Sequence, residues 1–346
     1  MKRILLLGAG GPAGLNVIDS LHGHYFLFGT DCNAYHLHWL TSKCARSFLV
    51  PRNTNPIYVK EINRIIVENQ IDMVMAQPDS EVMWLSEHRD EIDAITFLPP
   101  KETIRICANK HRSAEAWESV GFETAKSIKI ESYSDLENAF LELGSNLWIR
   151  AVDGAGGKGS TPASNIETAW HWIQYWWSRE PTWKFMAQEN LTGRNIAWSS
   201  VWHKGQLVIG QGRERLEYIY PHLAPSGITG TPSVARTIDE PEVNKLAIKA
   251  IMTIDPEPHG VFSVDLKYSK NGLLIPTEIN AGRFFTTSNF FSQAADRCQI
   301  PDANMPLLVV KMALENYIPF YNQVNPLPEN LYWIRHIDCP AILKTL

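Results

Sequence analysis

The sequence lacks the paired cysteines of a disulfide-stabilised secreted protein. Its 346 residues include five cysteines, at positions 32, 44, 107, 298 and 339, and no two of them have the CxxC spacing. An odd number of widely spaced cysteines argues against a disulfide framework and favours a reducing compartment. We therefore expect a cytoplasmic protein.

Long apolar runs and basic runs are also missing. The apolar stretch at residues 4–7 is too short for a signal peptide and ends in glycines, and no run of about 18 apolar residues occurs. Lysine and arginine are scattered along the chain, and the net charge is -5. The sequence predicts no membrane segment and no nucleic-acid partner.

The composition that remains is that of a folded globular chain. Hydrophobic residues make up 45% and charged residues 20%, which is outside the range of disordered proteins. At this length the chain can form two or three packed units. It contains no Gly-x-Ser-x-Gly elbow and no zinc signature.

The first hundred residues predict a parallel α/β unit. A strand at 3–7, a glycine turn at 8–14, a helix through Val17 and Leu21 and a strand at 25–29 form a right-handed βαβ opening. We expect further elements before the double proline Pro99-Pro100: a helix at 57–69, a strand at 71–76, a helix at 81–91 and a strand at 96–98. The double proline predicts the end of this first domain.

The rest of the chain predicts an antiparallel α+β region. We expect a helix from Ile104 through Lys110 and Trp117, a helix with N-cap Ser134 that Gly144 closes, and an amphipathic helix over 170–183. Strands are expected at 125–130, 147–151, 185–188, 196–203, 206–210, 261–268 and 273–278. Short turns at 204–205 and 270–272 predict two hairpins. The fold class is thus α/β plus α+β.

Two glycine clusters are candidates for phosphate binding. In the first, residues 8–14, the glycines precede a helix and Asp31 follows at a distance suited to a ribose-binding acid, which leaves an NAD-dependent oxidoreductase open. The same glycines also fit a tight strand-to-helix turn. The second, Gly154 to Gly159 with Lys158, is not a P-loop because Val152 replaces the first glycine, but it can fold over a polyphosphate.

A set of oxygen ligands lies near the C-terminal end. Asp265 is on one strand of the second predicted hairpin, and Glu278 and Asn280 are on the other. Positions two apart lie on the same face of a strand, and the hairpin brings Asp265 opposite them. Two carboxylates and an amide oxygen form a hard set suited to Mg²⁺.

Read in order, these motifs resemble the ATP-grasp superfamily, in particular the branch similar to the carbamoyl phosphate synthetase large subunit. The resemblance implies a Rossmann-like pre-ATP-grasp domain at residues 1–103 and a two-subdomain ATP-grasp domain at 104–320. The lid subdomain would span about residues 125–187, and a C-terminal tail residues 321–346. ATP would bind between the subdomains beneath the glycine-rich loop.

The resemblance also implies roles for individual residues. The expected nucleotide contacts are Lys110, Arg150, Gly154, Gly156, Gly157, Lys158, Gln188, Glu189, Asn190, Leu191 and Asn195. The implied ligands for Mg²⁺, or Mn²⁺ in its place, are Asp265, Glu278 and Asn280, and the implied catalytic residues are Arg283, Lys158 and Arg150. Arg213, Arg215 and Arg283 would face the substrate, because arginine forks match carboxylates. The chain departs from the pattern at Asn195, where many members have a ribose-binding glutamate.

The implied function is a carboxylate–amine ligase that activates a carboxylate as an acyl phosphate and releases ADP and phosphate. Its partners would be a small-molecule carboxylate and an amine, and a homodimer is the default assembly. Three alternatives stay open: an ATP-grasp enzyme acting on bicarbonate or carbamate, the oxidoreductase, and a nucleotide sensor without turnover. The sequence does not identify the substrates.

Overall fold

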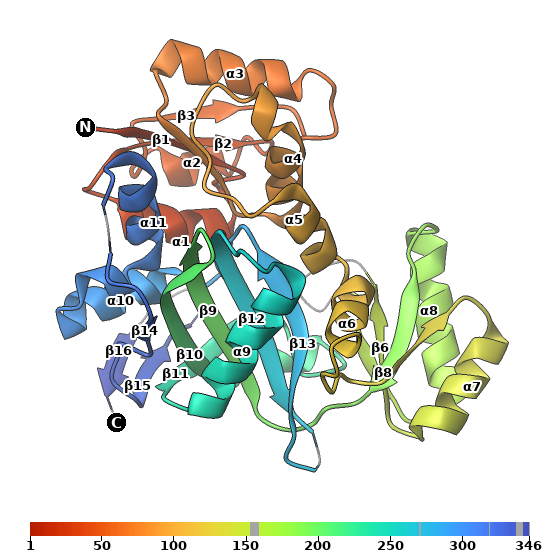
Figure 1. Cartoon of the computed structure of the whole chain (residues 1–346). Helices are drawn as coiled ribbons and strands as arrows, with labels where there is room; N and C mark the ends of the chain where they lie inside the picture. Colours follow the sequence, from red (N-terminus) through yellow and green to blue (C-terminus); the bar gives the residue numbers. More distant parts are fainter. Residues whose placement is uncertain (153–158, 270, 318, 337–341, 346) are drawn as a thin grey trace.

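The N-terminal part of the chain is a parallel sheet covered by helices. The computed structural model describes residues 1–152, 159–269, 271–317, 319–336 and 342–345 (Figure 1). The four parallel strands have the order β3-β2-β1-β4. Their bounds are β1 (Arg3–Leu7), β2 (Phe26–Asp31), β3 (Arg46–Leu49) and β4 (Met73–Ala76). This agrees with the expected βαβ unit.

The helices of this part follow the apolar periodicity. They are α1 (Pro12–Leu21), α2 (Leu37–Leu40), α3 (Tyr58–Asn69), α4 (Asp79–His88) and the 3₁₀ turn η1 (Arg89–Glu91). Helix α3 buries Ile62, Ile65 and Ile66, which lie on one face at helical spacing. It ends at Gln70, whose φ of 51° is left-handed. The strand expected at 96–98 was wrong: only Ile95 forms an isolated bridge, to Met73, and Pro99-Pro100 offer no N–H for a ladder.

Two short helices then lead into the second part of the chain. The single helix expected from Ile104 through Trp117 was wrong, because it is divided into α5 (Lys101–Ala108) and α6 (Lys110–Glu118). The break is at Asn109, which has an extended backbone and accepts a hydrogen bond from the Arg112 N–H as N-cap of α6. Such a cap favours starting a new helix over continuing the old one.

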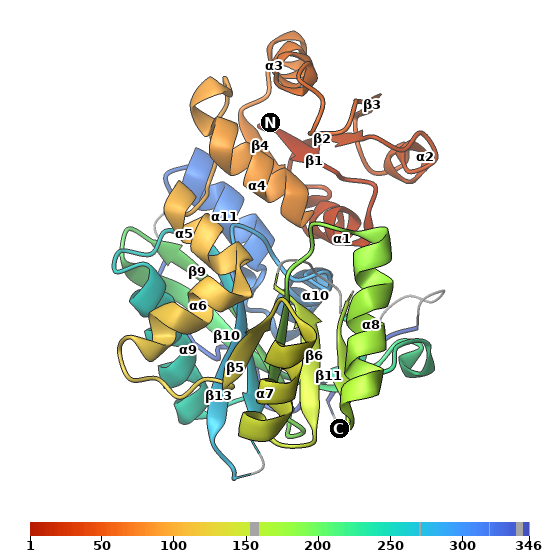
Figure 2. The same cartoon turned by 90° about the vertical axis from the view of Figure 1, so that its right-hand side faces the viewer.

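A small antiparallel sheet forms a separate lobe. Its strand order is β5-β8-β6-β7, with β5 (Ser127–Ile130), β6 (Leu147–Ala151), β7 (Thr161–Ala163) and β8 (Phe185–Glu189). Helices α7 (Tyr133–Leu143) and α8 (Ile166–Arg179) lie on its outer side, away from the large sheet (Figures 1 and 2). The N-cap of α7 is Ser132 and not the expected Ser134, because Ser132 and Asp135 form a reciprocal capping box. Gly144 closes the helix as expected.

A large, mostly antiparallel sheet makes up the rest of the chain. Its order is β13-β12-β9-β10-β11-β15-β16, and β14 pairs with β10. The strands are β9 (Asn195–His203), β10 (Gln206–Tyr218), β11 (Pro232–Ile238), β12 (Gly260–Tyr268), β13 (Leu274–Ala281), β14 (Gln323–Val324), β15 (Leu331–Ile334) and β16 (Ile342–Thr345). Both expected hairpins, β9–β10 and β12–β13, are confirmed.

Helices cover this sheet and join it to the N-terminal part. They are α9 (Pro241–Ile254), α10 (Asn289–Cys298) and α11 (Met305–Leu314), with 3₁₀ turns η2 (Pro221–Leu223) and η3 (Pro301–Ala303). Helix α9 packs on β12 and β13, while α10 and α11 contact α1. No helix among the described residues is long and apolar enough to cross a membrane.

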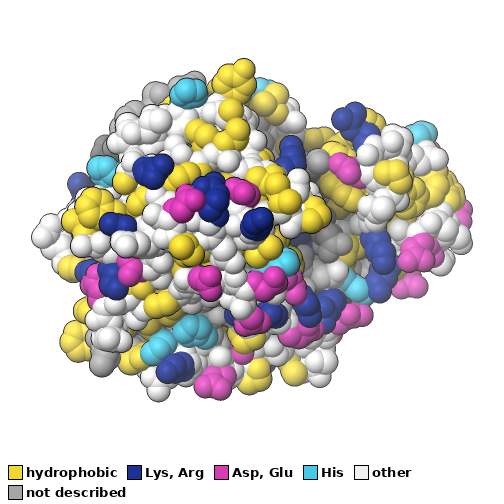
Figure 3. Space-filling view, turned by 90° about the horizontal axis from the view of Figure 1, so that it is seen from above, with side chains coloured by type: hydrophobic (Ala, Val, Ile, Leu, Met, Phe, Trp, Pro, Cys, Tyr) yellow, Lys and Arg dark blue, Asp and Glu magenta, His cyan; other side chains and the backbone are white. Residues whose placement is uncertain are grey.

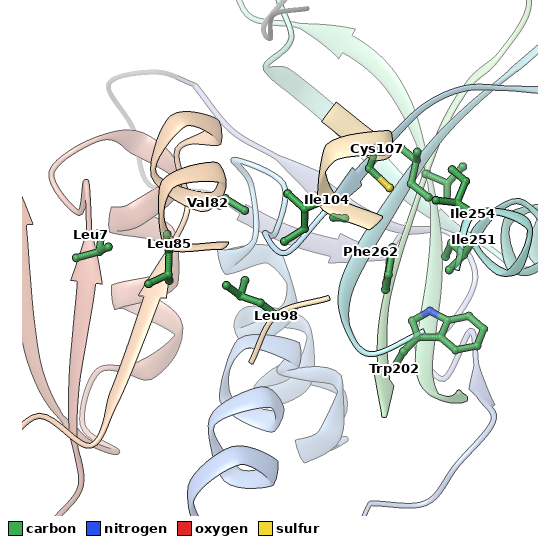
Figure 4. Packing of buried hydrophobic residues seen from close by; sticks show 14 of the residues in the cluster. Leu7, Val82, Leu85, Leu98, Ile104, Cys107, Trp202, Ile251, Ile254 and Phe262 are labelled. Carbon is green, nitrogen blue, oxygen red and sulfur yellow. The ribbon is translucent and has the colours of Figure 1, made fainter. Parts of the chain in front are cut away.

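One apolar core runs from the parallel sheet to the large sheet. Figure 4 shows it passing from Leu7 through Val82 and Ile104 to Phe262 and Ile251, all of them buried. These residues come from β1, α4, α5, β12 and α9. The small lobe has its own core between its sheet, α7 and α8. The surface is hollowed between this lobe and the main body (Figure 3).

Candidate active site

A cavity of about 460 Å³ lies between the small sheet, the large sheet and the N-terminal part, within the size range of small-molecule sites. Every described residue to which the resemblance gives a role lines it: Lys110, Arg150, Gln188, Glu189, Asn190, Leu191, Asn195, Arg213, Arg215, Asp265, Glu278, Asn280 and Arg283. The loop residues Gly154, Gly156, Gly157 and Lys158 lie outside the described residues. The structure therefore brings together groups that are up to 173 positions apart in the sequence, from Lys110 to Arg283.

The three oxygen ligands lie together as the hairpin predicts. Asp265 on β12 is the register partner of Glu278 on β13, and Asn280 follows two residues later on the same face of β13. Glu278 accepts from Arg150 Nη2 at 3.1 Å and lies 3.7 Å from Lys110 Nζ. A carboxylate pair with an adjacent amide thus faces the cavity, and cations border it.

The charges around this pair set its protonation. Burial raises the pKa of Asp265, although Arg215 opposes that shift with an ion pair at 2.7 Å. Burial also acts to raise the pKa of Glu278, but the positive charges of Lys110, Arg150 and Arg283 outweigh it and lower that pKa. Glu278 is therefore an anion at neutral pH.

The oxygen set fits a hard divalent cation. No cluster of three His, Cys, Asp or Glu side chains that could hold a metal occurs among the described residues, so a cation here would also need amide or phosphate oxygens. Mg²⁺ is commonly bound by one or two carboxylates together with substrate phosphates. Asp265, Glu278 and Asn280 provide that partial set.

The neighbouring cations fit phosphate groups. Arg150 projects from β6 of the small lobe, and its Nε is buried without a partner among the described residues. Lys110, the first residue of α6, is only 9% exposed. Burying such charges is favourable only where anions offset them.

The three other arginines that line the cavity have different partners. Arg215 lies beneath the Phe285 ring, with 5.0 Å from its Cζ to the ring centroid. Arg283 forms an ion pair with Asp79 and donates to Asn280 Oδ1 at 2.6 Å. Arg213 is 3% exposed and has no carboxylate partner among the described residues. Three guanidinium groups therefore line the cavity, and two of them already form ion pairs with carboxylates.

The segment expected to contact a nucleobase connects the two lobes. Residues 188–191 run from the end of β8 toward β9, and Leu191 is buried. Asn195, at the start of β9, bonds Tyr218 OH and accepts from Arg215 Nη1 at 3.2 Å. Both polar atoms of its amide are thus already hydrogen-bonded within the protein.

Sequence reasoning missed several cavity residues. Lys267 donates to the Leu191 carbonyl at 3.3 Å, lies 5.6 Å from the centroid of the Trp148 ring, and has a pKa that burial lowers. It is two residues from Asp265 on β12, so the strand period was a signal for it. Asp79 and Thr287 had no such signal, because they reach the cavity only through long-range packing.

The first glycine cluster has an internal role. Asp31 accepts from the Gly10 N–H at 3.1 Å and the Asn33 N–H at 2.8 Å, and it is 6% exposed. A Cβ at Gly10 would lie 2.4 Å from His36 Cβ. The glycine is therefore required for close packing, and both oxygens of the acid expected to hold a ribose are engaged by the backbone.

Comparisons with known proteins place this geometry in a known fold. No protein-family model matches the chain. The N5-carboxyaminoimidazole ribonucleotide synthase of Vibrio parahaemolyticus serotype O3:K6 is 24% identical over 247 residues, which is 68% of this chain and 63% of that protein. The chain thus spans less than two thirds of the length of this relative.

Two solved structures match nearly the whole chain. The biotin carboxylase domain of the Hydrogenobacter thermophilus 2-oxoglutarate carboxylase, a dimer in complex with MgADP and bicarbonate, superposes with a TM-score of 0.71. The identity is 13%, and the match covers 96% of this chain and 73% of that one. The L-amino acid ligase of Bacillus licheniformis superposes with a TM-score of 0.69 at 13% identity, covering 96% and 79%.

The chain therefore has the same overall fold as these structures. The mixed α/β architecture expected from the sequence is confirmed at this level. The ATP-grasp resemblance of the sequence predicts a nucleotide in the cavity between the small lobe and the large sheet. That site, and the specific branch, stay predictions.

Proposed function

We propose that this protein is an ATP-grasp enzyme and, more specifically, an ATP-dependent carboxylate–amine ligase. The observation that carries the proposal is the convergence of a carboxylate pair, Asp265 and Glu278, with buried cations in one cavity between two lobes. The relatives support it, since one is named a synthase, another a carboxylase and a third an L-amino acid ligase. Mg-ATP and two co-substrates, a carboxylate and an amine, are the proposed ligands.

The residues around the cavity would divide the work. Lys110 and Arg150 would hold the phosphates, with Lys158 from the glycine loop, and Gln188, Glu189, Asn190, Leu191 and Asn195 would contact the nucleoside. Asp265, Glu278 and Asn280 would hold Mg²⁺, or Mn²⁺ in its place, and the bound cation would offset charge on the phosphates. Arg283 would stabilise the transferring phosphoryl group.

The proposed reaction has two steps. A carboxylate oxygen attacks the γ-phosphorus, the bond to the ADP oxygen breaks, and an acyl phosphate forms. The amine then attacks the acyl carbon, phosphate leaves, and the amine proton passes to solvent or to the released phosphate. Positioning and electrostatics are sufficient for this chemistry, so no side-chain nucleophile is needed. Closure of the lobe over the cavity would exclude water that hydrolyses the acyl phosphate.

We also propose the corresponding division of the chain. Residues 1–103 would form a Rossmann-like pre-ATP-grasp domain, 104–320 the ATP-grasp domain with a lid near 125–187, and 321–346 a tail. The parallel sheet β3-β2-β1-β4 and the separate small sheet support the first two assignments. Strands β14, β15 and β16 of the tail region pair within the large sheet. Homodimerisation and a cytoplasmic location stay predictions.

The test is the release of ADP and phosphate from Mg-ATP in the presence of amino acids and small carboxylates, offered singly and in pairs with amines. Release that requires two co-substrates is the expected result. Formation of AMP and pyrophosphate, or binding of a nicotinamide cofactor without ATP turnover, would contradict the proposal. ATP binding without any turnover would instead favour a nucleotide sensor.

A second candidate is an enzyme that uses bicarbonate as the carboxylate. It is favoured by the bicarbonate bound in the Hydrogenobacter carboxylase structure. Bicarbonate belongs in the same panel: ADP release that requires bicarbonate together with an amine would select this version of the proposal over one with an organic acid.

A further inference from the structure

One arginine in the cavity differs from its neighbours in having no acid to balance it. Arg150 pairs with Glu278, Arg215 with Asp265 and Arg283 with Asp79. Among the described residues, Arg213 forms no ion pair, and the charges that shift its pKa after burial are the like charges of Arg215 and Arg335. The cavity therefore contains one buried positive charge that the protein itself leaves uncompensated.

The surroundings of this guanidinium make its lack of a partner costly. Arg213 is 3% exposed, and its Cζ lies 4.5 Å from the ring centroid of Phe290 and 5.2 Å from that of Phe291. Burial lowers its pKa to about 9, so it is still protonated at neutral pH. A charged group taken out of water without a counter-ion is strongly unfavourable. An apolar side chain of similar size would pack against these rings without that penalty.

The hydrogen bonds leave one edge of the guanidinium free. Nη2 donates to Thr287 Oγ1 at 3.2 Å, and Nη1 has no partner among the described residues. Both residues line the cavity. A guanidinium fork beside a hydroxyl can bind a planar carboxylate through two parallel N–H donors.

The sheet register separates this position from the predicted metal ligands. Arg213 on β10 is the partner of Ala197 on β9, and Ala197 is in turn the partner of Asp265 on β12. The Arg213 and Asp265 backbones are thus two strands apart, roughly 10 Å. The Arg213 guanidinium contacts Thr287 and the Phe290 and Phe291 rings, whereas Arg215 is the guanidinium paired with Asp265. An anion at Arg213 is therefore distinct from the carboxylate that would be phosphorylated near Asp265.

We propose that Arg213, with Thr287, binds a carboxylate carried by the amine substrate, which makes that substrate an α-amino acid or a peptide. The assignment to the amine rests on the proposed ligase function. A single unpaired charge matches a carboxylate monoanion better than a phosphate monoester dianion, because the neighbouring arginines are already paired. The uncompensated charge of the free protein is then neutralised when this substrate binds.

The first test measures binding without ATP. Thermal melting of the wild-type protein is recorded with each common L-amino acid and with the matching α-amides. At least one amino acid is expected to raise the melting temperature, whereas its amide is not. The Arg213→Met variant is expected to bind that amino acid at least about 30-fold more weakly than the wild-type protein. Arg213→Lys keeps the charge but loses the fork, and we expect it to bind with intermediate affinity.

Misfolding is separated from loss of the site by a matched variant. Arg236, on β11 outside the cavity, pairs with Glu214 at 2.7 Å. Arg236→Met should lower the melting temperature, because it leaves Glu214 without that partner. It should still show the increase in melting temperature that the amino acid causes. Arg213→Met should leave the melting temperature of the free protein unchanged or higher, because it removes an unpaired charge.

The proposal is overturned if Arg213→Met binds the amino acid like wild type or if the amides bind as well as the acids. Stabilisation by phosphate monoesters only, or by no amino acid at all, would also overturn it. Failure of the proposed function has a different signature. Amino-acid binding that depends on Arg213 without ADP release would reject the ligase and keep the site. ADP release with amines that lack a carboxylate, equal in Arg213→Met, would keep the ligase and reject the site.

Discussion

At the scale of single residues, the cavity is organised by pairs of opposite charge whose members come from different elements. Glu278 on β13 meets Lys110 of α6 and Arg150 of β6, and Asp265 on β12 meets Arg215 of β10. The carboxylates proposed for the metal are thus paired with cations in the free protein. Binding of Mg-ATP would replace the contacts of Glu278 with Lys110 and Arg150 by metal–carboxylate and cation–phosphate contacts.

Substituting Glu278 by Gln tests the metal assignment. The change removes one of the two carboxylates proposed as metal ligands, so we expect Mg-dependent ADP release to fall below detection while far-ultraviolet circular dichroism stays native. Glu240→Gln is the matched control, since Glu240 pairs with Arg194 outside the cavity at 2.7 Å. It should retain turnover. Wild-type turnover in Glu278→Gln would remove Glu278 from the proposed metal ligands.

Glu81 gives the stability a dependence on pH. Burial raises the pKa of this carboxyl to about 7 from an ordinary 4.5, and the Asp31 charge adds to the shift although Tyr58 donates to it. A raised acid pKa favours folding while the group is protonated, so its contribution is complete below pH 4.5 and is lost as pH rises to about 7. The full difference is about 3 kcal/mol.

Glu81→Gln should therefore flatten the fall in unfolding free energy between pH 4.5 and 7 and stabilise the protein at pH 8 by about 1–3 kcal/mol. Glutamine keeps an oxygen that can accept from Tyr58 OH, which lies 2.8 Å from the carboxylate. Urea denaturation at several pH values measures the effect. Glu68→Gln, at an exposed position of α3, should change stability by less than about 0.5 kcal/mol at every pH. An unchanged pH profile in Glu81→Gln would contradict the shift.

At the scale of elements, sequence periodicity predicted the strands and helices whose pattern is local. Strands β1 and β6 begin and end at the expected residues, and the Asp265–Glu278 register follows from the hairpin turn. The division of 104–117 into two helices was missed because the cap at Asn109 competes with an uninterrupted apolar pattern. The extension of β10 to Tyr218 was missed for another reason: its second half is polar, and Glu214 and Arg215 in it form ion pairs with residues distant in the sequence.

The segment between β8 and β9 has a steric requirement that supports its role as a hinge. A Cβ on Gly193 would lie 2.3 Å from the Tyr268 carbonyl oxygen, to which the Gly193 N–H already donates at 3.1 Å. Only glycine lets this segment approach β12 so closely. The contact positions residues 188–191 next to the cavity.

Gly193→Ala should push this segment away from β12. We expect a loss of about 1–3 kcal/mol in unfolding free energy from overpacking, together with weaker nucleotide binding measured by calorimetry with Mg-ADP. At Gly11, an added Cβ meets only the Gly8 carbonyl oxygen at 3.9 Å, so Gly11→Ala should leave nucleotide affinity intact. Normal Mg-ADP affinity in Gly193→Ala would separate this segment from the nucleotide site.

At the scale of the whole molecule, the cavity wall is contributed by the small sheet, by the large sheet, and by helices and a loop of the N-terminal part. Ala13 and Asp79 come from the N-terminal part, Trp148 and Arg150 from the small lobe, and Asp265 from the large sheet. The chemistry of the site could be predicted because the residues of its motifs have the types and spacings of the pattern that the sequence resembles. The N-terminal contribution could not, because the pairing of Asp79 with Arg283 joins residues that nothing in the local sequence relates.

Because the cavity is bordered by both the small lobe and the main body, we expect a bound nucleotide to stabilise both parts against unfolding. The small lobe has its own core and meets the main body around the cavity, so a nucleotide bound to both should stabilise them together. With Mg-ADP at about 100 times its dissociation constant, the free energy of unfolding should rise by about 2.7 kcal/mol. Differential scanning calorimetry should show a higher melting temperature with Mg-ADP than with ADP and EDTA, since removal of Mg²⁺ leaves Asp265 and Glu278 facing the phosphates. Hydrogen exchange should slow in both β6 and β12. Slowing confined to one lobe would place the nucleotide on that lobe alone and would contradict binding between the two.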